Sequence, residues 1–112
     1  MNRMTFDVTE TDVGSRQLYL SNAERFGIEG IFLVRSRENK RNPDQIQVLV
    51  QYDNRKATIG TVPEDAAKQL RDAAIRNEKI RVAKWRQYGG GREPYGITLT
   101  VECADISLTG VA

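Results

Sequence analysis

Alternating apolar and polar residues predict that this chain consists mainly of short β-strands. The clearest alternation lies at residues 45–52 and 97–103, and the apolar run at residues 30–35 is typical of a buried strand. Residues 6–11 and 17–20 alternate more weakly and are two further candidates for strands. The chain is therefore expected to fold around β-structure rather than around packed helices.

A hairpin and a helix are predicted in the middle of the chain. Residues 45–62 read as two strands joined by a polar four-residue turn at 53–56. Pro63 suits the first position of a helix, because its missing N–H is not needed there. Alanine and leucine then recur at three- and four-residue spacing, and Asn77 can adopt the left-handed conformation that ends a helix. This pattern predicts one main helix at about 63–76.

The last third of the chain predicts a strand from Ile80, a glycine-rich loop at 88–95 and a final strand. The final strand places four apolar side chains on one face: Ile97, Leu99, Val101 and Cys103. An extra helical turn is expected at 21–26, with Ser21 capping it. Six or so strands with one main helix favour a mainly β (α+β) fold, a small OB-like or SH3-like barrel. A split α+β sandwich is the alternative.

Length and composition indicate a single small domain. The chain has 112 residues, of which 39% are hydrophobic and 29% charged, as in ordinary globular domains. The longest apolar run, Ile31–Val34, is far shorter than the ~20 residues that span a bilayer. No secretory signal is visible at the start of the sequence. We therefore expect a cytoplasmic protein with no membrane partner.

The residue types present exclude several kinds of active site. The chain has one cysteine and no histidine, which excludes Cys/His zinc sites and every mechanism that needs a histidine. No phosphate-binding Gly-x-x-x-x-Gly-Lys loop occurs, and the glycine run at 89–91 is not followed by a helical pattern. The sequence therefore predicts a binding module with no catalytic residues, no metal and no cofactor.

Positive charge is concentrated in two short segments although the net charge is only +2. Residues 31–41 carry four cations against one carboxylate, and residues 76–92 carry six against one. Such segregation favours a surface that binds a polyanion such as a nucleic acid. The alternative interpretation is a solvated loop and a solvated strand edge, where lysine discourages edge pairing.

A series of short motifs suggests a family. A strand ending in Arg35 is followed by the polar loop 36–45, then Ile46-Gln47-Val48, then Ile59-Gly60-Thr61-Val62-Pro63, and a helix rich in alanine and leucine. In order and spacing these motifs resemble the HIRAN domain, a small module found alone in bacterial and viral proteins and at the front of fork-remodelling helicases. The resemblance covers about residues 30–103 and takes the chain, 1–112, as one HIRAN-like domain. It implies an OB-like barrel that binds single-stranded DNA, in some members the free 3′ end.

The loop departs from the family pattern at the residues that recognise an end. Family members usually carry Asn-Pro-Tyr-Asp, where this chain has Asn39, Lys40, Arg41 and Asn42. Arg41 replaces the aromatic residue that stacks on a base, and Asn42 replaces the carboxylate that grips a terminal hydroxyl. The exchange adds positive charge, so phosphate binding is expected to be retained.

The loop predicted at 88–95 and the strand before it supply both aromatic rings and cations. Single-strand binders combine a positive groove with rings on which bases stack. The candidate nucleic-acid-binding residues are Arg35, Arg37, Lys40, Arg41, Asn42, Lys84, Trp85, Arg86, Tyr88 and Arg92. The competing interpretations are that Trp85 packs in the core, and that Arg35 forms an ion pair with Glu38 or Glu64.

The sequence therefore predicts a non-enzymatic nucleic-acid-binding module that prefers single-stranded DNA or strand ends. The alternative is a small protein-interaction module, an adaptor or inhibitor of phage type, whose contact surface is the acidic segment with Asp7, Glu10 and Asp12. Binding of a small nucleotide by the glycine-rich loop is a third possibility. The oligomeric state stays open, since an exposed strand could pair two copies into a dimer.

Overall fold

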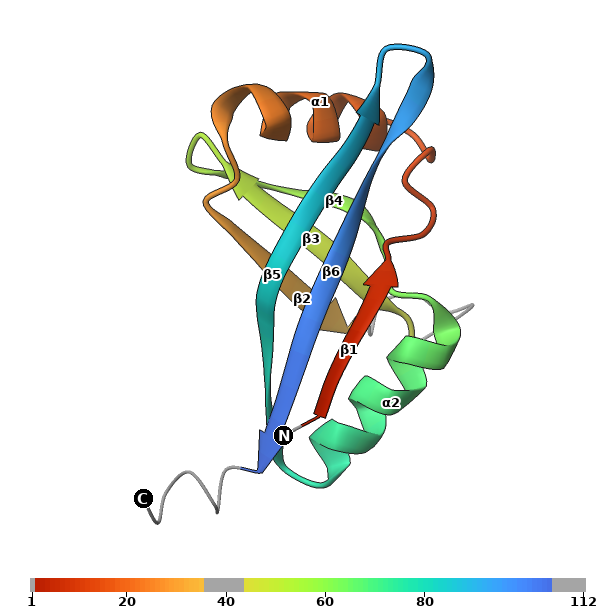
Figure 1. Cartoon of the computed structure of the whole chain (residues 1–112), viewed down its shortest axis with the longest axis vertical. Helices are drawn as coiled ribbons and strands as arrows, with labels where there is room; N and C mark the ends of the chain where they lie inside the picture. Colours follow the sequence, from red (N-terminus) through yellow and green to blue (C-terminus); the bar gives the residue numbers. More distant parts are fainter. Residues whose placement is uncertain (1, 36–43, 106–112) are drawn as a thin grey trace.

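The computed structural model describes residues 2–35 and 44–105, which form two three-stranded antiparallel sheets and two helices (Figure 1). The first sheet has the order β1–β6–β5 and consists of β1 (Asn2–Asp7), β5 (Glu78–Gly90) and β6 (Glu93–Asp105). The second has the order β2–β3–β4 and consists of β2 (Gly30–Arg35), β3 (Ile46–Tyr52) and β4 (Arg55–Thr61). The helices are α1 (Arg16–Phe26) and α2 (Glu64–Ile75).

The mainly β fold is confirmed, but the described strands do not close into the predicted barrel. The two sheets meet at one corner through an isolated bridge, in which Thr9 and Thr61 exchange two backbone N–H···O bonds of 2.9 Å. On the opposite side no described ladder joins β2 to β5. Side chains of α2 and β5, among them Leu70 and Ile80, lie along that side instead. The result is a sandwich joined at one corner and open at the other.

The core lies between the inner faces of the two sheets. Val48 and Val50 of β3 and Leu99 and Val101 of β6 are fully buried. The predicted apolar face of the final strand is confirmed, because all four of its residues are buried. Removing this apolar surface from water is the main source of stability in such a sandwich.

The β3–β4 hairpin is confirmed, but its turn is shorter than expected. Only Asp53 and Asn54 lie between the strands, with φ of 48° and 58°. Two residues with positive φ form the tight turn whose twist matches that of the flanking strands, and Asp and Asn tolerate this conformation well. Arg55 and Lys56, which the sequence assigned to the turn, begin β4.

The helices agree with the sequence in the middle of the chain and differ near its start. Helix α2 is confirmed, with Pro63 just before its first residue and Asn77 at φ 61° just after its end. The predicted strand at 17–20 is wrong, because these residues and the predicted turn at 21–26 form the single helix α1. Leu20 and Ala23 face the core three residues apart, a spacing that suits a helix. Neither helix has the length and apolar character needed to cross a bilayer.

Two other strand boundaries also differ. The first strand runs over Asn2–Asp7 instead of 6–11, because residues 2–7 pair with β6 from Cys103 back to Thr98. The predicted glycine-rich loop is mostly strand, since β5 and β6 continue to Gly90 and Glu93. Gly89 has φ 87°, and a Cβ there would meet the Pro94 carbonyl oxygen at 2.0 Å. Glycine thus allows a long, close-packed hairpin.

Gly60 is required where the two sheets meet. A Cβ at Gly60 would lie 2.4 Å from Val8 Cγ1 and 2.5 Å from the Thr9 carbonyl oxygen. Because one of these neighbours is backbone, Gly60→Ala is expected to lower the free energy of unfolding by about 2 kcal/mol or more. The control is Gly30→Ala, whose Cβ would meet only the Phe32 ring at 3.5 Å. Equal urea midpoints for the two variants would contradict this prediction.

The Cys103 thiol is expected to be unreactive in the folded protein. Its side chain is buried on the inner face of β6, and burial raises the pKa of the thiol. The reactive thiolate is therefore scarce and inaccessible at neutral pH. Labelling with dithionitrobenzoate should be slow in native buffer and become fast in denaturant. Rapid stoichiometric labelling of the native protein would show that this account of the core is wrong.

Candidate nucleic-acid interface

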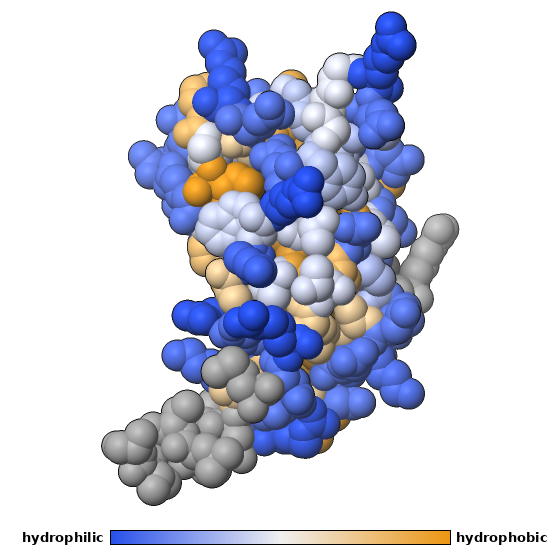
Figure 2. Space-filling model, in the orientation of Figure 1, coloured by the Kyte–Doolittle hydropathy of each residue, from blue (hydrophilic) through white to orange (hydrophobic). Residues whose placement is uncertain are grey.

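The outward side of the β1–β6–β5 sheet is a polar surface, which we call the outer face. Because successive residues of a strand point to opposite sides, β6 directs Thr98, Thr100 and Glu102 away from the core. Cross-strand pairing then sets three rows, in the order β1–β6–β5: Asp7–Thr98–Arg86, Thr5–Thr100–Lys84 and Arg3–Glu102–Arg81. Figure 1 has this sheet in front, and Figure 2 shows mostly hydrophilic side chains on the same side.

Glu102 holds an arginine on each side of it. Its Oε1 pairs with Arg3 Nη2, and its Oε2 pairs with Arg81 Nη2 at 2.8 Å. The carboxylate is buried beneath the two arginines, whose side chains remain 59% and 67% exposed. Hydrogen bonds from Arg3 and then Arg81 lower the pKa of Glu102. The row therefore keeps an excess positive charge turned toward solvent.

Threonines form the floor of a shallow hollow in this face. Thr5 Oγ1 and Thr100 Oγ1 share a hydrogen bond of 3.1 Å, and Thr98 Oγ1 donates to Asp7 Oδ1 at 2.5 Å. The hollow is bordered by Arg3, Thr5, Lys84, Trp85, Arg86, Thr98 and Thr100.

 The hollow has a volume of about 370 Å³. Small hydroxyl groups thus lie at its base, and long cationic side chains stand along both sides.

Tyr88 provides a flat ring next to this hollow. Its cross-strand partner is Gly96, and a Cβ at Gly96 would meet the Tyr88 Cζ atom at 2.4 Å. The ring therefore lies directly over the glycine backbone, while 42% of the residue remains exposed. Partial burial, and next the charge of Asp7, raise the pKa of the Tyr88 phenol. The phenol is neutral at physiological pH, so the ring is an uncharged surface on which a base can stack.

Trp85 lies at the edge of the same sheet. A register shift between Val82 and Lys84 places Trp85 opposite Leu99, an inner-face residue. Trp85 is nevertheless 39% exposed, because β5 is an edge strand of the sheet. It is therefore not a core residue, and it borders the hollow beside Lys84 and Arg86.

The structure brings together only some of the predicted site residues. Lys84, Trp85 and Arg86 border the hollow, Tyr88 follows them along β5, and Arg92 is exposed in the turn after β5. The predicted residues Arg37, Lys40, Arg41 and Asn42 lie outside the described residues.

Arg35 lies apart from the hollow. It ends β2 and forms a 2.5 Å ion pair with Asp44, at a groove that it shares with Arg71. Its expected partner Glu64 pairs with Arg71 instead, at 2.8 Å, and Glu38 is outside the described residues. Arg35, the described cation of the segment 31–41, therefore does not contribute to the outer face.

The sequence analysis missed the β1 and β6 side of the candidate interface. Arg3, Thr5, Thr98 and Thr100 were not candidates, although the alternation of the final strand already placed both β6 threonines opposite its apolar face. The contribution of β1 was hidden, because the strand begins earlier than the weak alternation near residue 6 indicates.

The acidic N-terminal segment is partly engaged within the fold. Asp7 accepts a hydrogen bond from Thr98, and Glu10 Oε2 accepts one from Thr61 Oγ1 at 3.2 Å. Asp12 is exposed. Two of the three carboxylates proposed as a protein-contact surface thus already have partners, which weakens that interpretation.

Comparisons with protein-family models, curated proteins and solved structures find no match to this chain. The resemblance to the HIRAN domain therefore stays a prediction from its motifs.

The arginine–glutamate row predicts a pH-dependent contribution to stability. The pKa of Glu102 is lower in the folded protein than its unfolded value of about 4.3. Ionised Glu102 therefore stabilises the fold in full at pH values above the unfolded pKa. This contribution is lost as the pH falls through the folded-state pKa. Glu102→Gln should therefore destabilise the protein at neutral pH, with a deficit that shrinks in acid.

Urea unfolding of both proteins over a pH series measures this difference. Glu93→Gln, at the exposed end of the β5–β6 hairpin, is the matched control and should show little deficit at any pH. A deficit for Glu102→Gln that is the same at acid and neutral pH would contradict the role assigned to the two arginines.

Proposed function

We propose that this protein is a non-enzymatic nucleic-acid-binding module that binds single strands across the outer face of the β1–β6–β5 sheet. The observation that carries the proposal is the hollow with threonines at its base and Arg3, Lys84 and Arg86 at its sides. The HIRAN resemblance of the sequence implies the same class of ligand.

Phosphate groups fit the hollow by charge and by hydrogen bonding. Arg3 and Arg86 carry guanidinium groups whose donors match phosphate oxygens, and Lys84 adds a mobile point charge. Arg3 is held in place by Glu102, so less conformational freedom is lost when it binds an oxygen. Affinity is therefore expected to come mainly from phosphate contacts and to fall as salt increases.

The ring of Tyr88 favours a single strand over a duplex. Only an unpaired base can turn its face onto a protein ring, and such stacking contributes about 1–3 kcal/mol per base. Tyr88 lies along β5 two residues beyond Arg86, so a strand following β5 could place phosphates near Lys84 and Arg86 and a base on the ring.

The alternative of a protein-interaction module is supported by a different region. This region is an apolar groove lined by residues of β2, α2 and β5, away from the outer face.

Binding of a fluorescein-labelled oligothymidylate of about 15 nucleotides tests the proposal through its salt dependence. Anisotropy titrations at about 50 and about 200 mM salt give the slope of log K against log salt. Lys84→Ala and Arg86→Ala should each weaken binding and make the slope shallower by about 0.7–1, the loss of one phosphate contact. Tyr88→Ala should weaken binding about tenfold with little change in slope.

Arg55→Ala is the control, because Arg55 is an exposed cation on β4, in the other sheet. It should leave both the affinity and the slope close to those of the unaltered protein. Absence of salt-sensitive binding, or equal losses for Arg55→Ala and Arg86→Ala, would contradict the proposed interface.

A further inference from the structure

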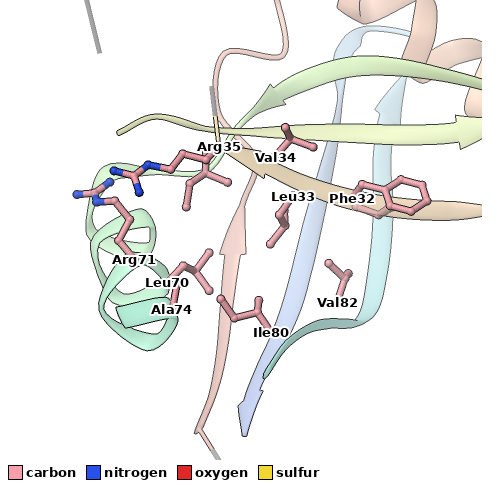
Figure 3. Close-up of a pocket in the computed structure, with 11 residues that line it drawn as sticks. Phe32, Leu33, Val34, Arg35, Leu70, Arg71, Ala74, Ile80 and Val82 are labelled. Carbon is pink, nitrogen blue, oxygen red and sulfur yellow. The ribbon is translucent and has the colours of Figure 1, made fainter. Parts of the chain in front are cut away.

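A groove runs along the open side of the sandwich, between β2, α2 and β5 (Figure 3). Its volume is about 480 Å³, within the range of ligand sites in proteins. Its walls are mostly apolar: Ile31, Phe32, Leu33, Val34, Ile46, Leu70, Ala74, Ile80 and Val82. In the close-up, Leu33 of β2 points toward Ile80 of β5 across the groove.

Strand β2 presents its edge to this groove. Five consecutive residues, 31–35, line it, although neighbouring residues of a strand point to opposite faces. The strand must therefore contribute backbone as well as side chains to the wall. Among the described strands β2 pairs only with β3, so its other edge offers N–H and C=O groups to an added strand.

Two arginines mark one end of the groove. Arg35 and Arg71 are the charged residues among those that line it, and Figure 3 shows their guanidinium groups close together. Asp44, which does not line the groove, holds both arginines in position. Its carboxylate pairs with Arg35, and its carbonyl oxygen accepts a hydrogen bond from Arg71 Nη1 at 2.9 Å. Arg71 also pairs with Glu64. Each guanidinium group thus already holds one carboxylate in place beside it, and the N–H donors that remain on the two groups suit a further carboxylate at the end of the groove.

We propose that this groove binds an extended peptide with alternating apolar side chains and a carboxylate at one end. The peptide adds to the free edge of β2, its apolar side chains contact Leu33, Ile80 and Val82, and its carboxylate reaches Arg35 and Arg71. Strand addition of this kind takes its affinity from backbone hydrogen bonds and its specificity from alternate side chains.

A fluorescein-labelled hexapeptide, Thr-Val-Thr-Val-Thr-Val with a free carboxylate, is a suitable probe because β2 has six residues. Fluorescence anisotropy measures its binding to the whole chain. Amidation of the carboxylate should weaken binding about tenfold or more, since hydrogen bonds to a charged group are among the strong ones. Replacing the second valine by proline removes a backbone donor and should weaken binding about fivefold or more.

Three variants separate the groove from the rest of the surface. Ala74 is exposed on α2 and lines the groove, so Ala74→Phe should fill the groove and reduce binding at least tenfold while the fold is retained. Arg71→Gln should reduce the affinity for the carboxylate peptide about tenfold and that for the amide little. Arg76→Gln is the matched control, because Arg76 also ends in an ion pair, with Glu78, and does not line the groove.

NMR chemical shifts of the backbone amides in the isotopically labelled protein show which surface the peptide contacts. The peptide is expected to change the amide chemical shifts of β2 and to leave those of Lys84, Arg86 and Tyr88 unchanged. Failure of the peptide to bind, equal binding to the Ala74→Phe variant, or displacement of the peptide by oligothymidylate would each overturn the proposal. The last result would assign the groove to the nucleic acid.

Discussion

The two-residue alternation of β6 is the constraint on which both the core and the candidate interface depend. β6 is the central strand of its sheet, and its inner residues, such as Leu99 and Val101, are fully buried. Its outer residues, Thr98, Thr100 and Glu102, form the middle of the polar surface. A slip of one residue in its pairing would bury the threonines and expose the leucine and valine. The same hydrophobic force that fixes the core therefore also fixes the order of groups on the outer face.

The incomplete closure of the sandwich explains why the molecule has a second surface of different chemistry. At one corner Gly60 lets the chain approach Val8 and Thr9 closely enough for two backbone hydrogen bonds. At the opposite side α2 lies beside β5, and β2 keeps a free edge among the described strands. One side of the protein is thus a cationic sheet face, and another is an apolar groove with arginines at its end. The two surfaces suit different ligands.

The sequence was sufficient for those parts of the fold where local signals and burial agree. The β3–β4 hairpin, helix α2 with Asn77 after its end, and the apolar face of β6 were all predicted. Residues 21–26 of helix α1 were predicted to be helical, but residues 17–20 were misread as a strand, because the buried residues of this helix are few and only packing against the sheets shows which face they share. The sequence could not decide between a closed barrel and the alternative of a split sandwich, because pairing between distant strands leaves no local pattern in the sequence.

In the candidate site, too, residues that are close in the sequence were predicted and residues brought together by distant strand pairing were not. Lys84, Arg86 and Tyr88 were found because cations and rings close together in the sequence stayed close in space. Arg3 and Thr5 were missed, because they join the site only through the pairing of the first strand with β6, nearly a whole chain length away. Arg35 was grouped with the site by its charge and its place in the HIRAN-like motifs, and the structure places it at the groove instead.

The most direct test of the central claim is to map amide chemical shifts in the isotopically labelled protein during titration with oligothymidylate at low salt. The account predicts progressive shifts at Thr98, Thr100 and Glu102 and at Lys84, Arg86 and Tyr88 of the neighbouring strand. Shifts confined to β2 and α2, or no shifts at all, would contradict the claim that the outer face of the sheet binds nucleic acid.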